Sequence, residues 1–194
     1  LQFRGNEAQI DADEADMEVL CEDAFAQVPP FRPEPAQVQV GAMLAHLEAA
    51  QRPVIVSGGG VRASGAGAEL VELAELLNIP VATSLTGKDA ISGTHPLSVG
   101  VVGTYSRASA NEVVGQSDLV CFVGTSTGSM TTHFWQVPPV GVAAIQIDID
   151  PEVLGRNYPL KAAVQADAKA TLSSMLALAD ASTATRRASW VERA

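Results

Sequence analysis

The sequence has few positive charges. Its 12 Lys and Arg residues stand against 22 Asp and Glu residues, which gives a net charge of −10. Proteins that bind nucleic acids neutralise phosphates with clustered cations, so we expect no nucleic-acid partner. Long apolar runs are also missing. None approaches the ~20 residues of a membrane-spanning helix, so we expect no membrane partner.

Cysteine is scarce as well, with single residues at Cys21 and Cys121. Two isolated cysteines do not make a disulfide framework, and Cys121 lies in the apolar run 119–123, where we expect a buried core thiol. This usage fits a reducing compartment, so we expect a cytoplasmic protein. The sequence begins without Met and without a signal-peptide pattern, and we interpret it as a piece of a longer protein.

The composition otherwise favours one domain with extensions, since 47% of the 194 residues are apolar and can form a sizeable core. Residues 1–36 are acidic and then rich in proline, which predicts a connecting segment from a preceding domain. Residues 37–180 form the predicted central α/β domain. Residues 181–194, rich in Ser, Thr and Arg, are the predicted linker toward a missing C-terminal domain.

Helix and strand patterns alternate within 37–180. Helical spacing of apolar residues predicts helices, and short apolar runs predict buried strands. The expected helices are 37–50, 64–77, 108–115, one starting at Asp150-Pro151 and one capped by Asp167; the expected strands are 53–57, 81–83, 119–123, 143–147 and 162–165. This alternation predicts a three-layer α/β/α, Rossmann-like parallel sheet of about six strands, similar to nucleotide-binding domains.

Small and acidic residues follow the predicted strands, at the edge where open parallel sheets bind ligands. Glycine lets a ligand approach the backbone, and free N–H groups at helix starts suit a pyrophosphate. Asp148 is the candidate for hydrogen bonds to a ribose. The candidate cofactor-binding residues are Gly59, Gly60, Ser84, Leu85, Gly103, Gly124, Asp148, Ile149 and Asp167.

Simpler interpretations of these residues stay open. A glycine after a strand is more often only a turn, and Asp148 can be a turn carboxylate. The run 58–63 fits G-x-G-x-x-A loosely, but the acid that an NAD fingerprint requires after the next strand is absent.

No metal site and no catalytic residue is predicted. Asp148 and Asp150 alternate along the chain, but Asp150 is expected to cap a helix, and no further ligand lies close in sequence. The three histidines, His46, His95 and His133, show neither a triad nor a zinc pattern.

Four motifs in combination resemble the central domain of thiamine diphosphate-dependent enzymes of the acetolactate synthase, oxalyl-CoA decarboxylase and benzaldehyde lyase type. They are R-P-V-I-V-S-G-G-G-V at 52–61, L-x-I-P-V-x-T-S-L-x-G-K at 77–88, His95-Pro96-Leu97, and I-D-I-D-P-x-x-x-G-R-N at 147–157. The resemblance covers about residues 38–179.

The resemblance implies a parent enzyme with three α/β domains, a lyase or transferase that makes or breaks a carbon–carbon bond in 2-oxo acid or acyl substrates. Thiamine diphosphate and Mg²⁺ would bind in the other two domains, so this domain alone would be inactive. It also implies a homo-oligomer, most simply a dimer, in which the other domains of the parent chain are partners of this one.

Central domains of this family sometimes hold FAD or ADP and sometimes nothing. Acetolactate synthases have an Arg where this sequence has Gly124-Thr125-Ser126, so the phosphates of FAD lack their partner and we expect an empty site. The alternative interpretation is a stand-alone module that binds FAD, NAD or ADP.

Overall fold

The computed structural model describes residues 2–4, 18–20, 26, 29–106 and 108–194, and the chain divides into two compact units, 1–31 and 32–194. In the first unit, β1 (Gln2–Arg4) pairs antiparallel with β2 (Glu18–Leu20). Cys21 and most of the acidic run lie outside the described residues. The connecting role of 1–36 therefore stays a prediction.

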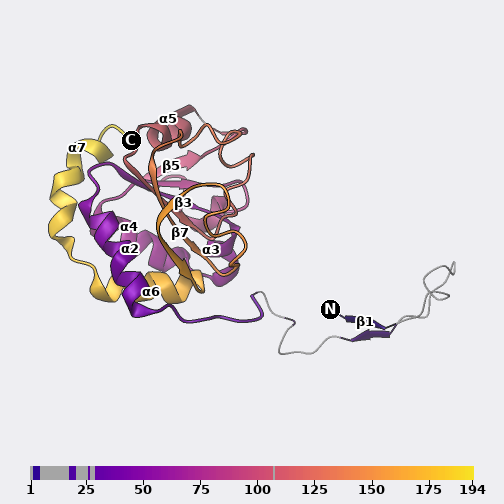
Figure 1. The fold of residues 1–194 in the computed structure, drawn as a ribbon. Coiled ribbons are helices and arrows are strands. Elements are labelled where there is room, and N and C mark those ends of the chain that lie inside the picture. Colours follow the sequence, from indigo (N-terminus) through magenta and orange to yellow (C-terminus); the bar gives the residue numbers. More distant parts are fainter. Residues whose placement is uncertain (1, 5–17, 21–25, 27–28, 107) are drawn as a thin grey trace. The chain divides into compact units, whose positions relative to one another are not determined.

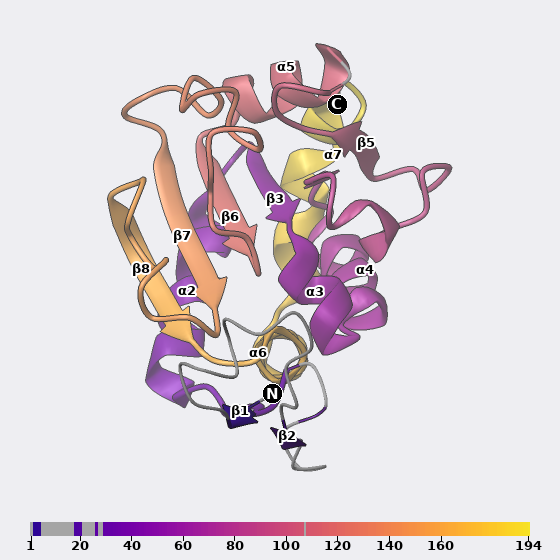
Figure 2. The same ribbon diagram turned by 90° about the vertical axis from the view of Figure 1, so that its right-hand side faces the viewer.

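The second unit contains a six-stranded sheet in which every neighbouring pair is parallel. The strand order is β5-β4-β3-β6-β7-β8 (Figures 1 and 2). The strands are β3 (Pro53–Ser57), β4 (Val81–Thr83), β5 (Ser98–Val101), β6 (Leu119–Val123), β7 (Ala143–Asp148) and β8 (Leu160–Gln165).

Helices cover both faces of this sheet, which confirms the predicted three-layer α/β/α fold. Side chains alternate between the faces, as the pleat requires: Ile55 of β3 packs into one core, while Val54 and Val56 pack into the other. The first core is shared with α2 (Gln37–Ala49), α3 (Gly59–Ser64), α4 (Gly67–Leu77) and α6 (Ala168–Leu178), and the second with α5 (Ala108–Gln116) and α7 (Ala188–Val191).

The structure differs from the sequence prediction in several elements. β5 was not located, because Ser98–Val101 is short and contains glycine. α3 begins among the glycines at Gly59, ahead of the predicted 64–77 helix. The helix expected at Asp150-Pro151 is wrong: residues 151–155 form turns, and Gly155 with a φ of 70° leads the chain toward β8.

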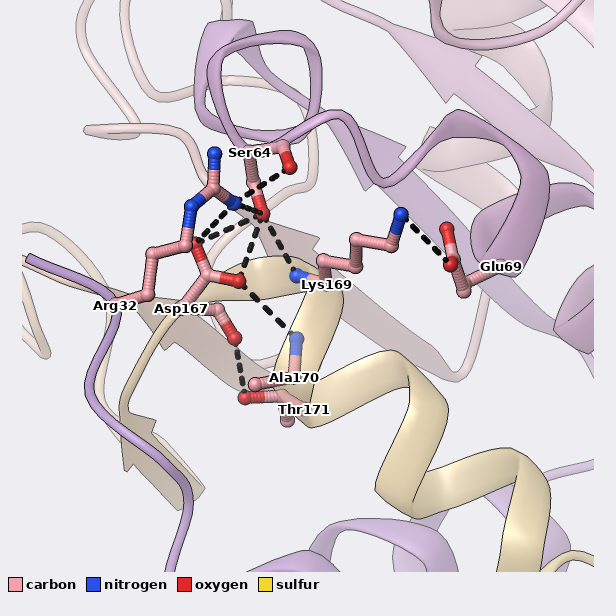
Figure 3. A network of polar contacts seen from close by, with 7 residues as sticks. All are labelled: Arg32, Ser64, Glu69, Asp167, Lys169, Ala170 and Thr171. Atoms are coloured by element: carbon pink, nitrogen blue, oxygen red, sulfur yellow. Dashed lines mark hydrogen bonds and ion pairs between the residues drawn. The ribbon is translucent and has the colours of Figure 1, made fainter. Parts of the chain in front are cut away.

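Asp167 caps α6, as predicted, and also joins three separate segments (Figure 3). Its carboxylate accepts the N–H of Ala170 over 3.1 Å and the hydroxyl of Ser64 over 2.8 and 2.9 Å. Arg32 forms an ion pair with it at 3.4 Å, and the Asp167 N–H donates to the carbonyl of Pro33. Segment 32–33, α3 and the start of α6 are therefore tied together.

The segment 181–194 is packed against the domain through two buried side chains. It forms a 3₁₀ helix (Ala181–Arg187) followed by α7. The Arg187 guanidinium, which is fully buried, donates to the carbonyls of Leu47, Ala50 and Leu77 at the ends of α2 and α4. Trp190 Nε1 donates to the carbonyl of Pro53 over 2.9 Å. That this segment leads to a further domain stays a prediction.

Arg187 supplies hydrogen-bond donors and a positive charge to the carboxyl-terminal ends of α2 and α4. The last carbonyls of a helix have no intrahelical partner and carry partial negative charge. Burial lowers the pKa of the Arg187 guanidinium, but an arginine in a protein stays protonated. One cation therefore satisfies the ends of two helices at once.

We predict that Arg187→Met lowers the free energy of unfolding by about 2 to 4 kcal/mol, because it leaves buried carbonyls without a charged donor. Arg186→Met is the matched control, since Arg186 is exposed and makes one hydrogen bond, to the carbonyl of Glu48; it should change stability by about 0.5 kcal/mol or less. Urea unfolding followed by circular dichroism measures both. Equal midpoints for the two variants would contradict the prediction.

Cys121 should not react with alkylating reagents in the native protein. Burial raises the pKa of its thiol to about 12, and the thiolate is the reactive form. Mass spectrometry after iodoacetamide treatment measures this reactivity, and labelling of Cys121 at pH 8 without denaturant would refute the prediction.

The same thiol makes stability depend on pH. Because unfolded Cys121 ionises near the reference pKa of 9.0, the wild-type protein should lose stability as the pH rises from about 9 toward 12, and Cys121→Ala should lose less.

Candidate functional site

The carboxyl ends of the six parallel strands meet at one edge of the sheet, called here the carboxyl edge. β3 and β6 are neighbours although β4 and β5 lie between them in sequence, so the strand order reverses at this pair. Open α/β sheets bind ligands at such a reversal. Of the predicted residues, Gly59 and Gly60 follow β3 and Gly124 follows β6, so the fold brings these three to the reversal.

The two turns at the reversal touch through their backbones. The Gly60 N–H donates to the Gly124 carbonyl over 2.9 Å, and the Gly58 N–H to the Val123 carbonyl over 2.8 Å. A Cβ at position 60 would lie 2.7 Å from Gly124 Cα, and one at position 58 would collide with the Gly124 carbonyl oxygen. Glycine is therefore required at both positions for this turn-to-turn contact.

Ser84 and Leu85 follow β4 and lie together at a small pocket. The pocket, about 180 Å³, also includes Tyr105 and Met130 in its wall. The Ser84 hydroxyl is buried, shares a 3.1 Å hydrogen bond with Thr86 Oγ1 and accepts the Gly87 N–H. The predicted hydroxyl for a ligand is therefore already used within its own turn, while Leu85 is exposed.

Gly103 fixes the turn after β5 against the loop after β6. Its φ is 114°, and a Cβ there would collide with the carbonyl oxygen of Met130. Asn111 brackets it, accepting the Gly103 N–H over 2.8 Å and donating to the Gly103 carbonyl over 3.0 Å. The Thr104 N–H donates to the same Met130 carbonyl.

The loop after β6 carries functional candidates that the sequence prediction missed. Phe134 and Trp135 are both exposed, and with His133 they form three consecutive residues with left-handed backbone, at φ values of 47°, 55° and 60°. Trp135 Nε1 donates to the Thr127 carbonyl, and the Asn157 amide donates to the same carbonyl. Two aromatic residues in a polar stretch were the only sequence signal.

The carboxylates of Asp148 and Asp150 each accept a hydrogen bond from the backbone N–H two residues later in the chain. Asp148 Oδ1 accepts the Asp150 N–H over 3.0 Å, and Asp150 Oδ1 accepts the Glu152 N–H over 2.9 Å. Burial raises the pKa of Asp148, and its backbone hydrogen bond to Asp150 offsets part of the effect. Ile149 between them is exposed. The predicted cap at Asp150 closes a turn instead of starting a helix.

Asp167, the last predicted ligand residue, is 2% exposed and saturated by Ser64, Arg32 and Ala170. It acts as a structural junction, as Figure 3 shows. The fold therefore gathers the glycines, Ser84 and Leu85 at one edge, but commits most of their polar groups, and that of Asp167, to internal contacts.

A larger cavity of about 840 Å³ lies along β5. Its wall includes Lys88 and Asp89 from the segment after β4, Tyr105 after β5, Ser109 of α5, and Ala194. It shares Leu85 and Tyr105 with the smaller pocket. The two hollows are therefore neighbours, with Leu85 and Tyr105 in the wall of both.

Among the described residues, no group of three His, Cys, Asp or Glu side chains is arranged to hold a metal ion. His95 pairs through Nε2 with Glu75 Oε1 at 3.1 Å. No helix in the described part of the chain is long and apolar enough to cross a membrane.

Comparison with known proteins agrees with this architecture. The family described as "Thiamine pyrophosphate enzyme, central domain" matches residues 40–175. A relative from Methanococcus aeolicus named "Probable acetolactate synthase large subunit" is 38% identical over 73% of this chain and 23% of its own length. The sulfoacetaldehyde acetyltransferase of Rhodobacter capsulatus is 34% identical over 75% of this chain and 25% of its own length.

A solved structure agrees as well. A Mycobacterium smegmatis enzyme assigned as thiamin diphosphate-dependent superposes with a TM-score of 0.61 and 26% identity, over 77% of this chain and 29% of its own. The chain thus spans about a quarter of the length of the curated relatives it matches. Since the family match covers residues 40–175, the chain belongs to the thiamine pyrophosphate enzymes and contains their central domain.

Proposed function

We propose that the parent protein is a thiamine diphosphate-dependent lyase or transferase that makes or breaks a carbon–carbon bond next to a carbonyl group in 2-oxo acid or acyl substrates. The family match over residues 40–175 carries this proposal. Relatives named as an acetolactate synthase large subunit and a sulfoacetaldehyde acetyltransferase support a transferase of this kind. When bound, the cofactor supplies a thiazolium carbanion that adds to carbonyl groups.

In this proposal the cofactor and its Mg²⁺ bind in domains that precede and follow this one. The described carboxylates support this, since Asp148, Asp150 and Asp167 accept hydrogen bonds from their own neighbourhood. The central domain then acts as a scaffold that holds the other domains. We further propose a cytoplasmic homodimer; a monomeric mass for the parent by light scattering would contradict the dimer.

The 194-residue chain alone should neither bind thiamine diphosphate tightly nor turn over pyruvate. The reason is that no metal-holding cluster lies among its described residues. Calorimetry with thiamine diphosphate and Mg²⁺, followed by a decarboxylation assay, tests this, with the full-length parent as the positive control. Micromolar binding or turnover by the short chain would contradict the division of labour. A full-length parent that neither binds thiamine diphosphate nor shows turnover would refute the proposed activity itself.

We also propose that any nucleotide site at the carboxyl edge, formed by the candidate residues around Asp148, has low affinity. Support comes from the Gly60–Gly124 backbone contact and the internal hydrogen bonds of Ser84. The net charge of −10 also disfavours a pyrophosphate.

ADP or FAD at about 0.1 mM should leave the melting temperature of the chain unchanged. A ligand about tenfold below a millimolar Kd adds less than about 0.1 kcal/mol of stability. Asp148→Ala tests the proposed ribose contact, and Asp150→Ala is the matched control. A shift of several degrees that Asp148→Ala abolishes and Asp150→Ala retains would instead establish a tight nucleotide site.

A further inference from the structure

The cavity of about 840 Å³ along β5 has the size of a small-molecule site, since ligand pockets in proteins measure about 300 to 1,000 Å³. We call it the β5 cavity. Its wall comes from the end of β4, segment 88–93, β5 and the start of α5. The proposed function does not use it, because the thiamine cofactor is expected in other domains.

One buried hydroxyl group in this wall has no partner inside the described part of the protein. Thr83, the last residue of β4, lines the cavity and is 3% exposed, and its hydroxyl makes no hydrogen bond to a described residue. Ser57, which pairs with Thr83 in register on β3, is fully buried, and its Oγ also has no partner there. Buried hydroxyls without partners are destabilising, so each such group calls for an explanation.

The other polar groups of the wall are uncommitted as well. Lys88 and Asp89 are exposed, and neither forms a hydrogen bond or an ion pair with the residues that the structure describes. Four further hydroxyls of the wall are in the same state, those of Ser98, Tyr105, Ser106 and Ser109. The candidates at the carboxyl edge differ from them, because most of their polar groups are used in internal contacts.

The charges of the wall favour a neutral ligand. Among its described residues, Lys88 supplies one positive charge and the adjacent Asp89 one negative charge, so a charged ligand would meet attraction and repulsion together. Hydroxyl groups both donate and accept hydrogen bonds, and they therefore match the hydroxyls of a ligand. The ring of Tyr105, which is 70% exposed, adds an apolar face.

We propose that the β5 cavity binds a small neutral molecule with several hydroxyl groups, a cyclic polyol or a monosaccharide. Thr83 and Asp89 accept hydrogen bonds from its hydroxyls, Lys88 donates one, and the C–H face of its ring lies against Tyr105. This inference goes beyond the proposed function and does not depend on it, since neither thiamine diphosphate nor the other domains take part.

An NMR titration of the ¹⁵N-labelled chain tests the proposal. The probes are myo-inositol and methyl α-D-glucopyranoside, which are neutral and do not react with lysine amines. Acetate and glycine, at the same millimolar concentrations, are the anionic and zwitterionic comparisons. Both polyols should shift the amide signals of Thr83, Gly93 and Ser109, all in the cavity wall, until the site is saturated. The signal of Leu178 on α6 should not move.

Thr83→Val removes the hydroxyl with little change of shape. It should weaken polyol binding about fivefold, the effect of losing a hydrogen bond worth about 1 kcal/mol. Thr104→Val is the matched control, because Thr104 Oγ1 is also buried without a partner among the described residues, and Thr104 is not in the cavity wall. Neither variant should have a lower melting temperature, since each loses a hydroxyl that no described residue binds.

Three results would overturn the proposal. Saturable shifts with acetate or glycine alone would replace the neutral ligand by a charged one, and no saturable shift with either polyol would remove the site. Equal affinities of Thr83→Val and wild type would exclude the Thr83 contact. Thiamine diphosphate binding by the full-length parent is a separate measurement, and its failure would refute the proposed function without affecting the polyol site.

Discussion

The backbone contact between the turns after β3 and β6 is the constraint on which the carboxyl edge depends. Gly60 donates to Gly124 at the point where the strand order reverses, and Gly58 lies against the same turn. No side chain larger than hydrogen fits at Gly58 or Gly60 without displacing this backbone. At this reversal, where open α/β sheets bind ligands, the two turns are in backbone contact. The hollows open instead beside β4 and β5.

The sequence was sufficient to predict the layers and most strands, because wholly apolar runs such as 119–123 have no alternative to burial on both sides. It was less informative where polar and small residues form structure. Ser98–Val101 becomes a strand because β4 offers it a partner, and no local pattern reports that. Asp150-Pro151 carries a helix-start signal without the apolar repeat that would continue a helix.

The candidate site shows a different limit. Residue types and strand ends correctly brought glycines and Ser84 to one edge, yet the free hydrogen-bonding capacity of a side chain depends on its neighbours in space. Asp167 was noted both as a helix cap and as a possible ligand. The cap is confirmed, and Ser64 and Arg32, which also bind it, are over 100 residues away in sequence. The exposed Phe134 and Trp135 of the loop after β6 were missed because no local pattern reports which apolar side chains stay exposed.

The burial of Arg187 and Trp190 also has a mechanical consequence. A pull on the chain at Ala194 is transmitted through Trp190 to Pro53, at the start of the central strand β3, and through Arg187 to the ends of α2 and α4. The contacts of this segment therefore join it both to the middle of the sheet and to two helices. A domain attached at this end would therefore be linked by hydrogen bonds to the sheet and to two helices of this domain.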